Sequence, residues 1–231
     1  ISEIQLENVS YHYPDAKENI LQNINMVLKK GFTSLIGDSG CGKSTLSKIL
    51  TRQLEGYEGK IRIDAKELSS LDIADYRKHV CYLSNDTFLL HLSIRDGFRF
   101  YHPELDEKTM LALLEEVSLK DRVMDAGGLD YVPQEGANDL SGGEKQRLVL
   151  SYYLSTKRDF YVFDETTSNI DKESEEIILD KIHELSKNCI VLFISHRLHN
   201  ALKADYVYYF DKEQGKLLSG TVDELLKTCS P

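Results

Sequence analysis

A glycine-rich segment near the start of the chain has the residue types that bind phosphate. Residues 37–45 read Gly-Asp-Ser-Gly-Cys-Gly-Lys-Ser-Thr and fit the pattern GxxxxGK[ST]. Glycine reaches backbone conformations closed to other residues, so successive N–H groups can point at phosphate oxygens. Lys43 adds a mobile positive charge for the β and γ phosphates, and the hydroxyl of Ser44 can bind Mg²⁺. The segment predicts a nucleoside triphosphate site made of Gly37, Asp38, Ser39, Gly40, Cys41, Gly42, Lys43, Ser44 and Thr45.

Two carboxylates follow an apolar run later in the chain. The run 160–163 ends in Asp164 and Glu165. Strands of a parallel sheet end at the edge where ligands bind, so both side chains should reach the phosphate site. Asp164 is then predicted to hold Mg²⁺, directly or through water, and Glu165 to deprotonate the attacking water as general base. Taken alone, the pair could also be a solvated acidic turn.

A third motif predicts another anion site at the start of a helix. Residues 140–147 read Leu-Ser-Gly-Gly-Glu-Lys-Gln-Arg. Serine is a good helix cap, and two glycines would let an anion approach the free N–H groups of the first turn. One γ phosphate does not need two such sites in one chain, so this one is expected to serve the nucleotide of a partner. Its residues are Ser141, Gly142, Gly143 and Glu144.

Apolar periodicity predicts the elements that position these motifs. Helical patterns cover 43–54, 93–154 and 171–186. The β-like runs are 4–9, 24–28, 33–36, 61–63, 80–83, 160–163, 189–194 and 206–210. Alternation of apolar strands and helices indicates an α/β fold with a mostly parallel core sheet, and the helical middle is interpreted as an inserted subdomain.

Composition excludes several classes of protein. The chain has 231 residues, of which 41% are hydrophobic and 29% charged, as in a soluble globular protein. A net charge of −10 argues against a nucleic-acid partner. Apolar runs are much shorter than the roughly 18 residues of a membrane span. Because the chain begins at Ile1 rather than Met, we expect it to be cut from a longer polypeptide.

The four cysteines show no metal or disulfide spacing. Cys41, Cys81, Cys189 and Cys229 form no CxxC motif and are expected to be reduced thiols. Cys41 lies in the phosphate loop, where the helix dipole and Lys43 favour a thiolate, so thiol reagents could block nucleotide binding. An inert small residue is the alternative.

Together the motifs resemble the ATP-binding domain of ATP-binding cassette (ABC) transporters. The phosphate loop, the LSGGE signature, the Asp-Glu strand end, Ser-Asn-Ile-Asp at 168–171 and His196 follow in that family's order. The resemblance covers almost the whole chain. It implies a P-loop NTPase core with an N-terminal antiparallel β subdomain at 1–87 and 158–231, and a helical subdomain with the signature at 88–157. It also implies ATP and Mg²⁺ as cofactors.

The resemblance suggests roles for further residues. Tyr13 is similar to the aromatic that stacks on adenine, with a surface tyrosine as the alternative. His196 resembles the switch histidine that contacts the γ phosphate. Asp171 resembles an aspartate that couples the two sites of a dimer. Glu135 lies where exporters carry a glutamate that touches the membrane domain, although its neighbours fit loosely.

One position departs from the family pattern. Asn85 stands where the family usually has a glutamine that meets Mg²⁺. Asparagine keeps the amide but loses about 1.5 Å of reach. We expect Asn85 to contact the metal through water or after a larger loop movement, and the coupled step to be weaker or slower.

The resemblance also implies partners and a location. A second ABC domain would pair head to tail with this one, and a transmembrane domain, expected N-terminal in the same polypeptide, would hold it at the cytoplasmic face of a membrane. Phe88, Leu89, Leu90 and Phe98 are candidate apolar anchors, with internal packing as the alternative. An exporter ATPase is preferred over a separate importer subunit or an ABC ATPase without a transport role. The transported substrate is not encoded in this segment.

Overall fold

A computed structural model describes residues 1–85, 89–211, 216–221 and 224, grouped in two compact units. The sheet unit comprises Ile1–Tyr82, Arg158–Glu165 and His183–Pro231, and the helical unit comprises Leu83–Lys157 and Thr166–Ile182. The helical unit thus includes 166–182, which the sequence assigned to the core. No helix among the described residues has the length and apolar character needed to cross a membrane.

A six-stranded sheet positions the chemistry of the sheet unit. Its order is β10-β9-β3-β8-β7-β6, with parallel pairing from β9 through β3 and β8 to β7, and antiparallel pairing of β10 with β9. Both β7 and β8 are buried along their whole length, as expected for apolar strands covered on two faces. The strands are β3 (Gly31–Gly37), β6 (Val80–Ser84), β7 (Phe160–Asp164), β8 (Ile190–Ser195), β9 (Tyr206–Asp211) and β10 (Lys216–Gly220).

The register brings three strand ends to one edge of this sheet. Ile36 of β3 pairs with Ser195 of β8, and Asp164 of β7 pairs with Ile194 of β8. The segments that follow these strands begin with the phosphate loop, Glu165 and His196. They therefore leave the sheet side by side, as the sequence predicted.

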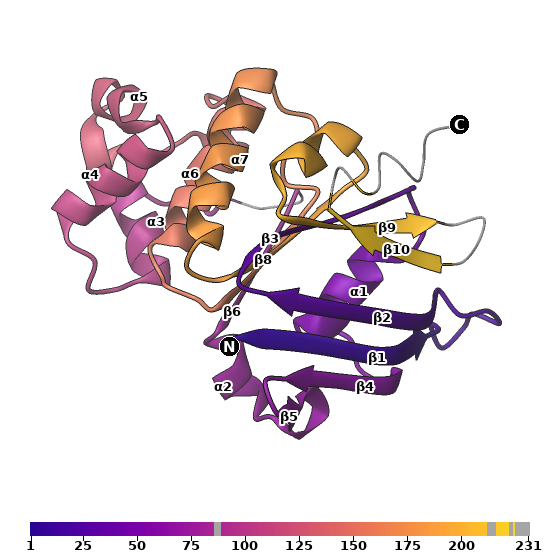
Figure 1. The fold of residues 1–231 in the computed structure, drawn as a ribbon. Helices are drawn as coiled ribbons and strands as arrows, with labels where there is room; N and C mark the ends of the chain where they lie inside the picture. Colours follow the sequence, from indigo (N-terminus) through magenta and orange to yellow (C-terminus); the bar gives the residue numbers. More distant parts are fainter. Residues whose placement is uncertain (86–88, 212–215, 222–223, 225–231) are drawn as a thin grey trace. The chain divides into compact units, whose positions relative to one another are not determined.

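A four-stranded antiparallel sheet completes the β structure of this unit, in the order β2-β1-β4-β5 (Figure 1). One buried cluster joins Ile4 and Leu28 of this sheet, Ile49 of the first helix, and Val162 and Leu192 of the six-stranded sheet. The expected α/β fold with an antiparallel N-terminal part is confirmed. The elements are β1 (Glu3–Tyr11), β2 (Leu21–Lys29), α1 (Lys43–Leu50), β4 (Glu58–Ile63), β5 (Lys66–Glu67), η1 (Leu68–Ser70), α2 (Ile73–Arg77) and η4 (Leu198–Lys203).

The helix α1 is shorter than predicted. It ends at Leu50 rather than Leu54 because Arg52 has a positive φ of 54°, which reverses the chain. The N–H groups of Gln53 and Leu54 then both donate to the carbonyl of Lys48, closing the last turn.

The helical unit has capped helices instead of one continuous helical stretch. Ser93, Asp106 and Ser141 each cap a helix by accepting a hydrogen bond from a backbone N–H three residues later. The helix Ile94–Tyr101 is followed by Pro103, and the helix Lys120–Asp125 is followed by Gly127, which has φ of 122°. Both residues interrupt the helical conformation of the chain. The elements are α3 (Ile94–Tyr101), α4 (Glu107–Glu116), α5 (Lys120–Asp125), η2 (Gly128–Asp130), η3 (Glu135–Ala137) and α6 (Gly142–Leu154).

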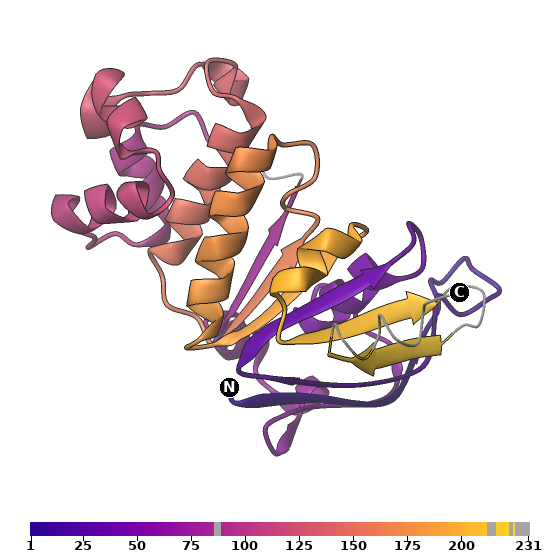
Figure 2. The same cartoon turned by 45° about the horizontal axis from the view of Figure 1, so that its top comes forward.

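The last long helix, α7 (Lys172–Ser186), starts in the helical unit and runs beside α6 in both ribbon views (Figures 1 and 2).

Met110, Leu113 and Leu114 are buried on the inner face of α4, as the helical spacing predicted. The helical unit therefore has its own packed interior.

Candidate active site

The phosphate loop is built so that only glycine fits at its junction with α1. Gly42 has φ of 105°, and a Cβ atom there would lie 2.7 Å from Cδ2 of Leu21 and 2.9 Å from the carbonyl oxygen of Ile20. Lys43, only 5% exposed, donates from Nζ to the carbonyls of Gly37 at 2.7 Å and Asp38 at 2.9 Å. The ammonium is therefore held across the loop at the positive end of the α1 dipole, where anions bind.

Asp164 is tied to the same helix through hydroxyl groups. The residue is 4% exposed; its Oδ1 accepts from Oγ of Ser44 at 3.2 Å, and its Oδ2 accepts from Oγ of Ser47 at 3.4 Å. The hydroxyl of Tyr82 donates to the same Oδ2 at 3.0 Å. The structure thus brings together Ser44 and Asp164, the two metal ligands predicted within the sheet unit.

These donors fit Mg²⁺. The ion takes oxygen ligands and is usually bound by one or two protein groups together with substrate phosphates and water. Ser44 and Asp164 supply a hydroxyl and a carboxylate. Within the described part of the chain, no group of three or more His, Cys, Asp or Glu side chains forms a separate metal cage. Because one hydroxyl and one carboxylate leave most coordination positions of Mg²⁺ open, this pair suits a metal that also binds phosphate oxygens.

Glu165 and His196 form a close pair at the same edge. Nδ1 of His196 lies 2.7 Å from Oε2 of Glu165. Glu165 has φ of 56°, and its N–H donates to the carbonyl of Ile194 at 3.0 Å. This left-handed turn directs the Glu165 side chain differently from the buried carboxylate of Asp164. The two adjacent carboxylates are therefore available for different tasks.

The predicted adenine contact lies next to the phosphate loop. The hydroxyl of Tyr13 is 3.1 Å from Oγ1 of Thr45, and the ring packs edge-on against Tyr11 with centroids 5.3 Å apart. The side chain is otherwise exposed. An exposed aromatic face fixed beside the loop can stack on a flat base.

The signature residues begin α6 in the helical unit, where Ser141 is the N-cap. Oγ of Ser141 accepts from the N–H of Glu144 at 3.1 Å, while Oε2 of Glu144 accepts from the N–H of Ser141 at 2.7 Å. This reciprocal capping box contributes about 1 kcal/mol to the helix. It also engages Glu144, which the sequence assigned to nucleotide.

Gly143 has a packing role that the sequence did not reveal. A Cβ atom at Gly143 would lie 2.1 Å from Oγ of Ser174 and 2.6 Å from Oδ2 of Asp171. Asp171 in turn accepts from the N–H of Ser174 at 2.8 Å, and hydrogen bonds from Ser174 lower the pKa of this carboxyl group. The starts of α6 and α7 therefore touch at Gly143.

Asn85 and Glu135 also lie in the helical unit. Nδ2 of Asn85 donates to Oγ of Ser168 at 3.3 Å, and Nε2 of Gln146 donates to the carbonyl of Asn85 at 3.2 Å. Glu135 is exposed in a 3₁₀ turn, and Nζ of Lys145 donates to the carbonyl of Gly136 in that turn. Asn85 thus belongs to a different unit from Ser44 and Asp164.

The apolar anchors divide into buried and exposed residues. Phe98 is fully buried against Tyr152, with ring centroids 4.8 Å apart, so its prediction as a docking anchor is wrong. Leu90 is 44% exposed, and Phe100, which the sequence analysis missed, is 64% exposed. Phe88 lies outside the described residues, as does Cys229.

Two hydroxyl donors to Asp164 were also missed. Ser47 lies three residues after Ser44, so helical spacing could have identified it as a neighbour on the same face. Tyr82 sits in an apolar strand, where a tyrosine is ordinary, and no sequence signal points from it to Asp164.

Cys41 is buried in the loop, with Sγ 3.9 Å from Nζ of Lys43. Burial limits the access of thiol reagents, which favours the inert alternative for this residue.

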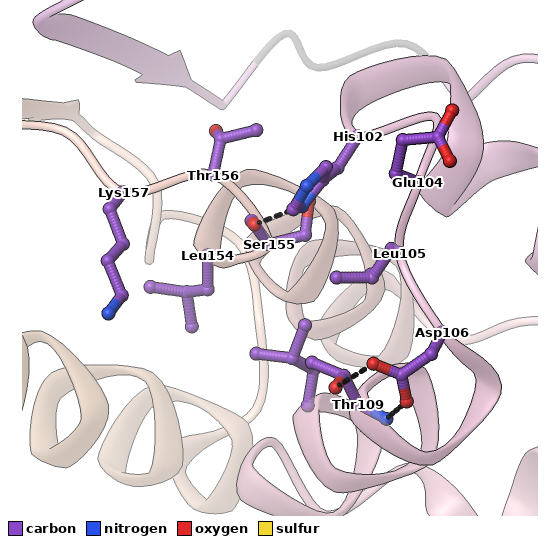
Figure 3. Close-up of a pocket in the computed structure, with 10 residues that line it drawn as sticks. His102, Glu104, Leu105, Asp106, Thr109, Leu154, Ser155, Thr156 and Lys157 are labelled. Carbon is purple, nitrogen blue, oxygen red and sulfur yellow. Dashed lines mark hydrogen bonds between the residues drawn. The ribbon is translucent and has the colours of Figure 1, made fainter.

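A separate pocket of about 650 Å³ lies within the helical unit (Figure 3). There Nδ1 of His102 is bonded to the carbonyl of Ser155 at 2.9 Å, and Asp106 caps α4 through Thr109. Its residues belong to none of the predicted sites.

Comparison with known proteins places the chain in a family. The ABC transporter family pattern matches residues 21–168. An "Uncharacterized ABC transporter ATP-binding protein" of Haemophilus influenzae is 34% identical over 227 residues, which are 97% of this chain and 40% of that protein. The leukotoxin export ATP-binding protein LtxB of Aggregatibacter actinomycetemcomitans is 33% identical over 220 residues, 93% of this chain and 31% of that protein.

Two further similarities agree. The ABC multidrug transporter MDR2 of Trichophyton equinum is 32% identical over 230 residues, 97% of this chain and 17% of that protein. A solved bacterial Atm1-family ABC exporter with ATP bound has the same fold, with a TM-score of 0.89 and 24% identity over 99% of this chain and 40% of that one. The chain thus spans less than half the length of these relatives. Since the family pattern covers more than half of the chain and relatives above 30% identity match nearly all of it, the chain belongs to the ABC transporter family as an ATP-binding domain.

Proposed function

We propose that the chain binds ATP with Mg²⁺ and hydrolyses it to ADP and phosphate. The observation that carries this proposal is the contact between Glu165 and His196 at the edge where Asp164 meets Ser44. A carboxylate directly after the metal carboxylate, oriented by an imidazole, suits a general base for water attack on the γ phosphate. Hydrolysis of ATP therefore accounts for the arrangement better than binding alone.

Each side chain at this edge of the sheet has one task in the proposed hydrolysis. Glu165 accepts a proton from the attacking water as the new oxygen–phosphorus bond forms and the bond to the β–γ bridging oxygen breaks, so that ADP leaves with the electron pair. His196 orients Glu165, and Lys43 with the loop N–H groups offsets the charge on the phosphates. Mg²⁺, held by Ser44 and Asp164, would supply further charge neutralisation on the β and γ oxygens.

A second ABC domain is proposed as the partner that completes each site. The capped α6 start at Ser141, with its N–H groups and Gly142 and Gly143, suits the γ phosphate of nucleotide bound to another subunit. Head-to-tail pairing would give two ATP molecules, each between the phosphate loop of one subunit and the signature of the other. Asp171, beside Gly143, is suited to link the two sites.

Transport across a membrane is proposed as the work performed, in an exporter, with this domain at the cytoplasmic face. The names of two relatives, a multidrug transporter and a leukotoxin export protein, support this direction. The exposed Leu90 and Phe100 in the helical unit offer an apolar surface for a transmembrane partner, and Glu135 is an exposed charge in the same unit. A transmembrane domain in the same polypeptide is part of this proposal.

The test uses Glu165→Gln in size-exclusion chromatography with and without Mg²⁺ and ATP. We expect an ATP-dependent shift to a dimer, because bound ATP is no longer hydrolysed and the closed state accumulates. Lys43→Ala serves as the matched control, since it removes phosphate binding and should stay monomeric. Near-normal hydrolysis by Glu165→Gln would contradict the assignment of the base.

A further inference from the structure

We propose that Tyr82 is a positioning residue for the metal site. Its hydroxyl donates to Oδ2 of Asp164 at 3.0 Å within the sheet unit. Asp164 is almost completely buried, so its orientation is set by the few groups that contact it. This inference rests on the proposed function, because it concerns metal that binds with nucleotide.

The two oxygens of Asp164 have different partners. Oδ1 accepts from Ser44, the hydroxyl predicted to bind Mg²⁺, while Oδ2 accepts from Tyr82 and, at a longer distance of 3.4 Å, from Ser47. When the Ser44 proton points at Oδ1, the lone pairs of Ser44 point away from the carboxylate and remain available to a cation. The orientation of Asp164 therefore fixes the orientation of its metal-binding neighbour.

Tyr82 contributes the shorter of the two contacts to Oδ2. A hydrogen bond to an ionised carboxylate is stronger than one between neutral groups, and a carboxylate held on one oxygen cannot rotate freely about its last bond. Outer contacts of this kind orient metal ligands and commonly change metal affinity tenfold or more when removed. The chain Tyr82, Asp164, Ser44 thus preorganises the cation site from β6.

Tyr82 is close in sequence to the position where the family pattern usually has a metal-contacting glutamine. It lies three residues before Asn85, the shortened replacement for the usual glutamine. The strand β6 therefore contacts the metal carboxylate through Tyr82 itself, independently of the reach of Asn85.

The experiment measures Mn²⁺ affinity by electron paramagnetic resonance, in the presence of a non-hydrolysable ATP analogue. Tyr82→Phe is expected to raise the Mn²⁺ Kd about tenfold. The affinity for the analogue in EDTA should stay within about twofold, because the phosphate loop keeps its contacts. Tyr76→Phe is the matched control: its hydroxyl donates to the carbonyl of Leu50 and not to Asp164, so its Mn²⁺ Kd should not change.

A second variant tests the same oxygen. Ser47→Ala removes a hydroxyl whose single proton lies closer to the carbonyl of Ser44, at 2.9 Å, than to Oδ2, at 3.4 Å, so its Mn²⁺ Kd is expected to rise less than that of Tyr82→Phe, by no more than about threefold. An unchanged Mn²⁺ Kd in Tyr82→Phe would overturn the role of Tyr82. An equal loss of analogue binding in EDTA would also overturn it, since Tyr82 would then support the phosphate loop. Failure of the unsubstituted protein to bind Mn²⁺ with the analogue would instead count against the proposed function itself.

Discussion

Nδ1 of His196 lies 2.7 Å from Oε2 of Glu165, although the two residues are 31 positions apart in the chain. Parallel pairing of β7 with β8 makes this contact possible, because the two residues follow the ends of neighbouring strands. A base and the group that orients it should behave as one catalytic unit.

We therefore expect the effects of Glu165→Gln and His196→Ala on turnover to be non-additive. Glu165→Gln should lower the ATPase kcat by about 10²- to 10⁴-fold. His196→Ala should lower it by about 10²- to 10³-fold. The double variant should lose no more than the larger single effect. Steady-state ATPase assays would measure all three, and multiplied losses in the double variant would show that the two residues act independently.

Gly143→Ala should destabilise the helical unit by about 1–3 kcal/mol, because the new Cβ overlaps Ser174. Adding Ser174→Gly should recover part of the loss by removing the overlapped atoms. Urea unfolding of the three proteins measures this.

Gly142→Ala is the matched control for Gly143→Ala. Its Cβ would lie 3.6 Å from the nearest atom, the carbonyl oxygen of Asn169, which is an ordinary contact distance. Equal losses in the two alanine variants would mean that contact with Ser174 is not the reason for glycine at 143.

We predict that Asn85→Gln raises the ATPase rate or lowers the Mg²⁺ concentration needed for the half-maximal rate, because it puts back the longer amide side chain that the family pattern usually has at this position, with about 1.5 Å more reach. An increase of about twofold or more is expected. Ser168→Ala is a useful control, since it removes the partner of the Asn85 amide at 3.3 Å without changing reach. If neither the Mg²⁺ dependence nor the ATPase rate changes in Asn85→Gln, the shorter side chain of Asn85 does not limit turnover and the prediction is wrong.

Cys81 and Cys189 should resist alkylation in the folded protein at pH 8. Burial raises the pKa of Cys81 to about 12 and that of Cys189 to about 11, so the reactive thiolate is scarce. The folded protein keeps these two thiol protons at pH values where an unfolded chain, with thiol pKa values near 9, has released them. The free energy of unfolding that depends on the protonated thiols is therefore fully present below about pH 9 and is lost as the pH rises toward 12. Mass spectrometry after iodoacetamide treatment, with and without urea, checks the prediction; rapid labelling without urea would contradict it.

Local sequence was enough to predict the motifs and most of the strands. Residue type and short spacing are enough to recognise three features: the phosphate loop, the Asp164–Glu165 pair and the Ser141 cap. Both can be read directly from the sequence. Helix ends were less predictable. The end of α1 depends on the positive φ of Arg52, which no propensity of arginine signals.

The sequence by itself predicted a phosphate-binding loop, metal-binding groups and a general base, and it showed that the strands before the phosphate loop, before Glu165 and before His196 are apolar enough to be buried. The tertiary structure decided which of them meet. Sheet order brings His196 to Glu165, and packing of β6 and α1 around β7 gives Asp164 its hydroxyl donors from Tyr82 and Ser47. The tertiary structure also buries Phe98 and leaves Phe100 exposed on the same helix, α3. These outcomes depend on contacts between distant segments, whereas the information in a motif is local.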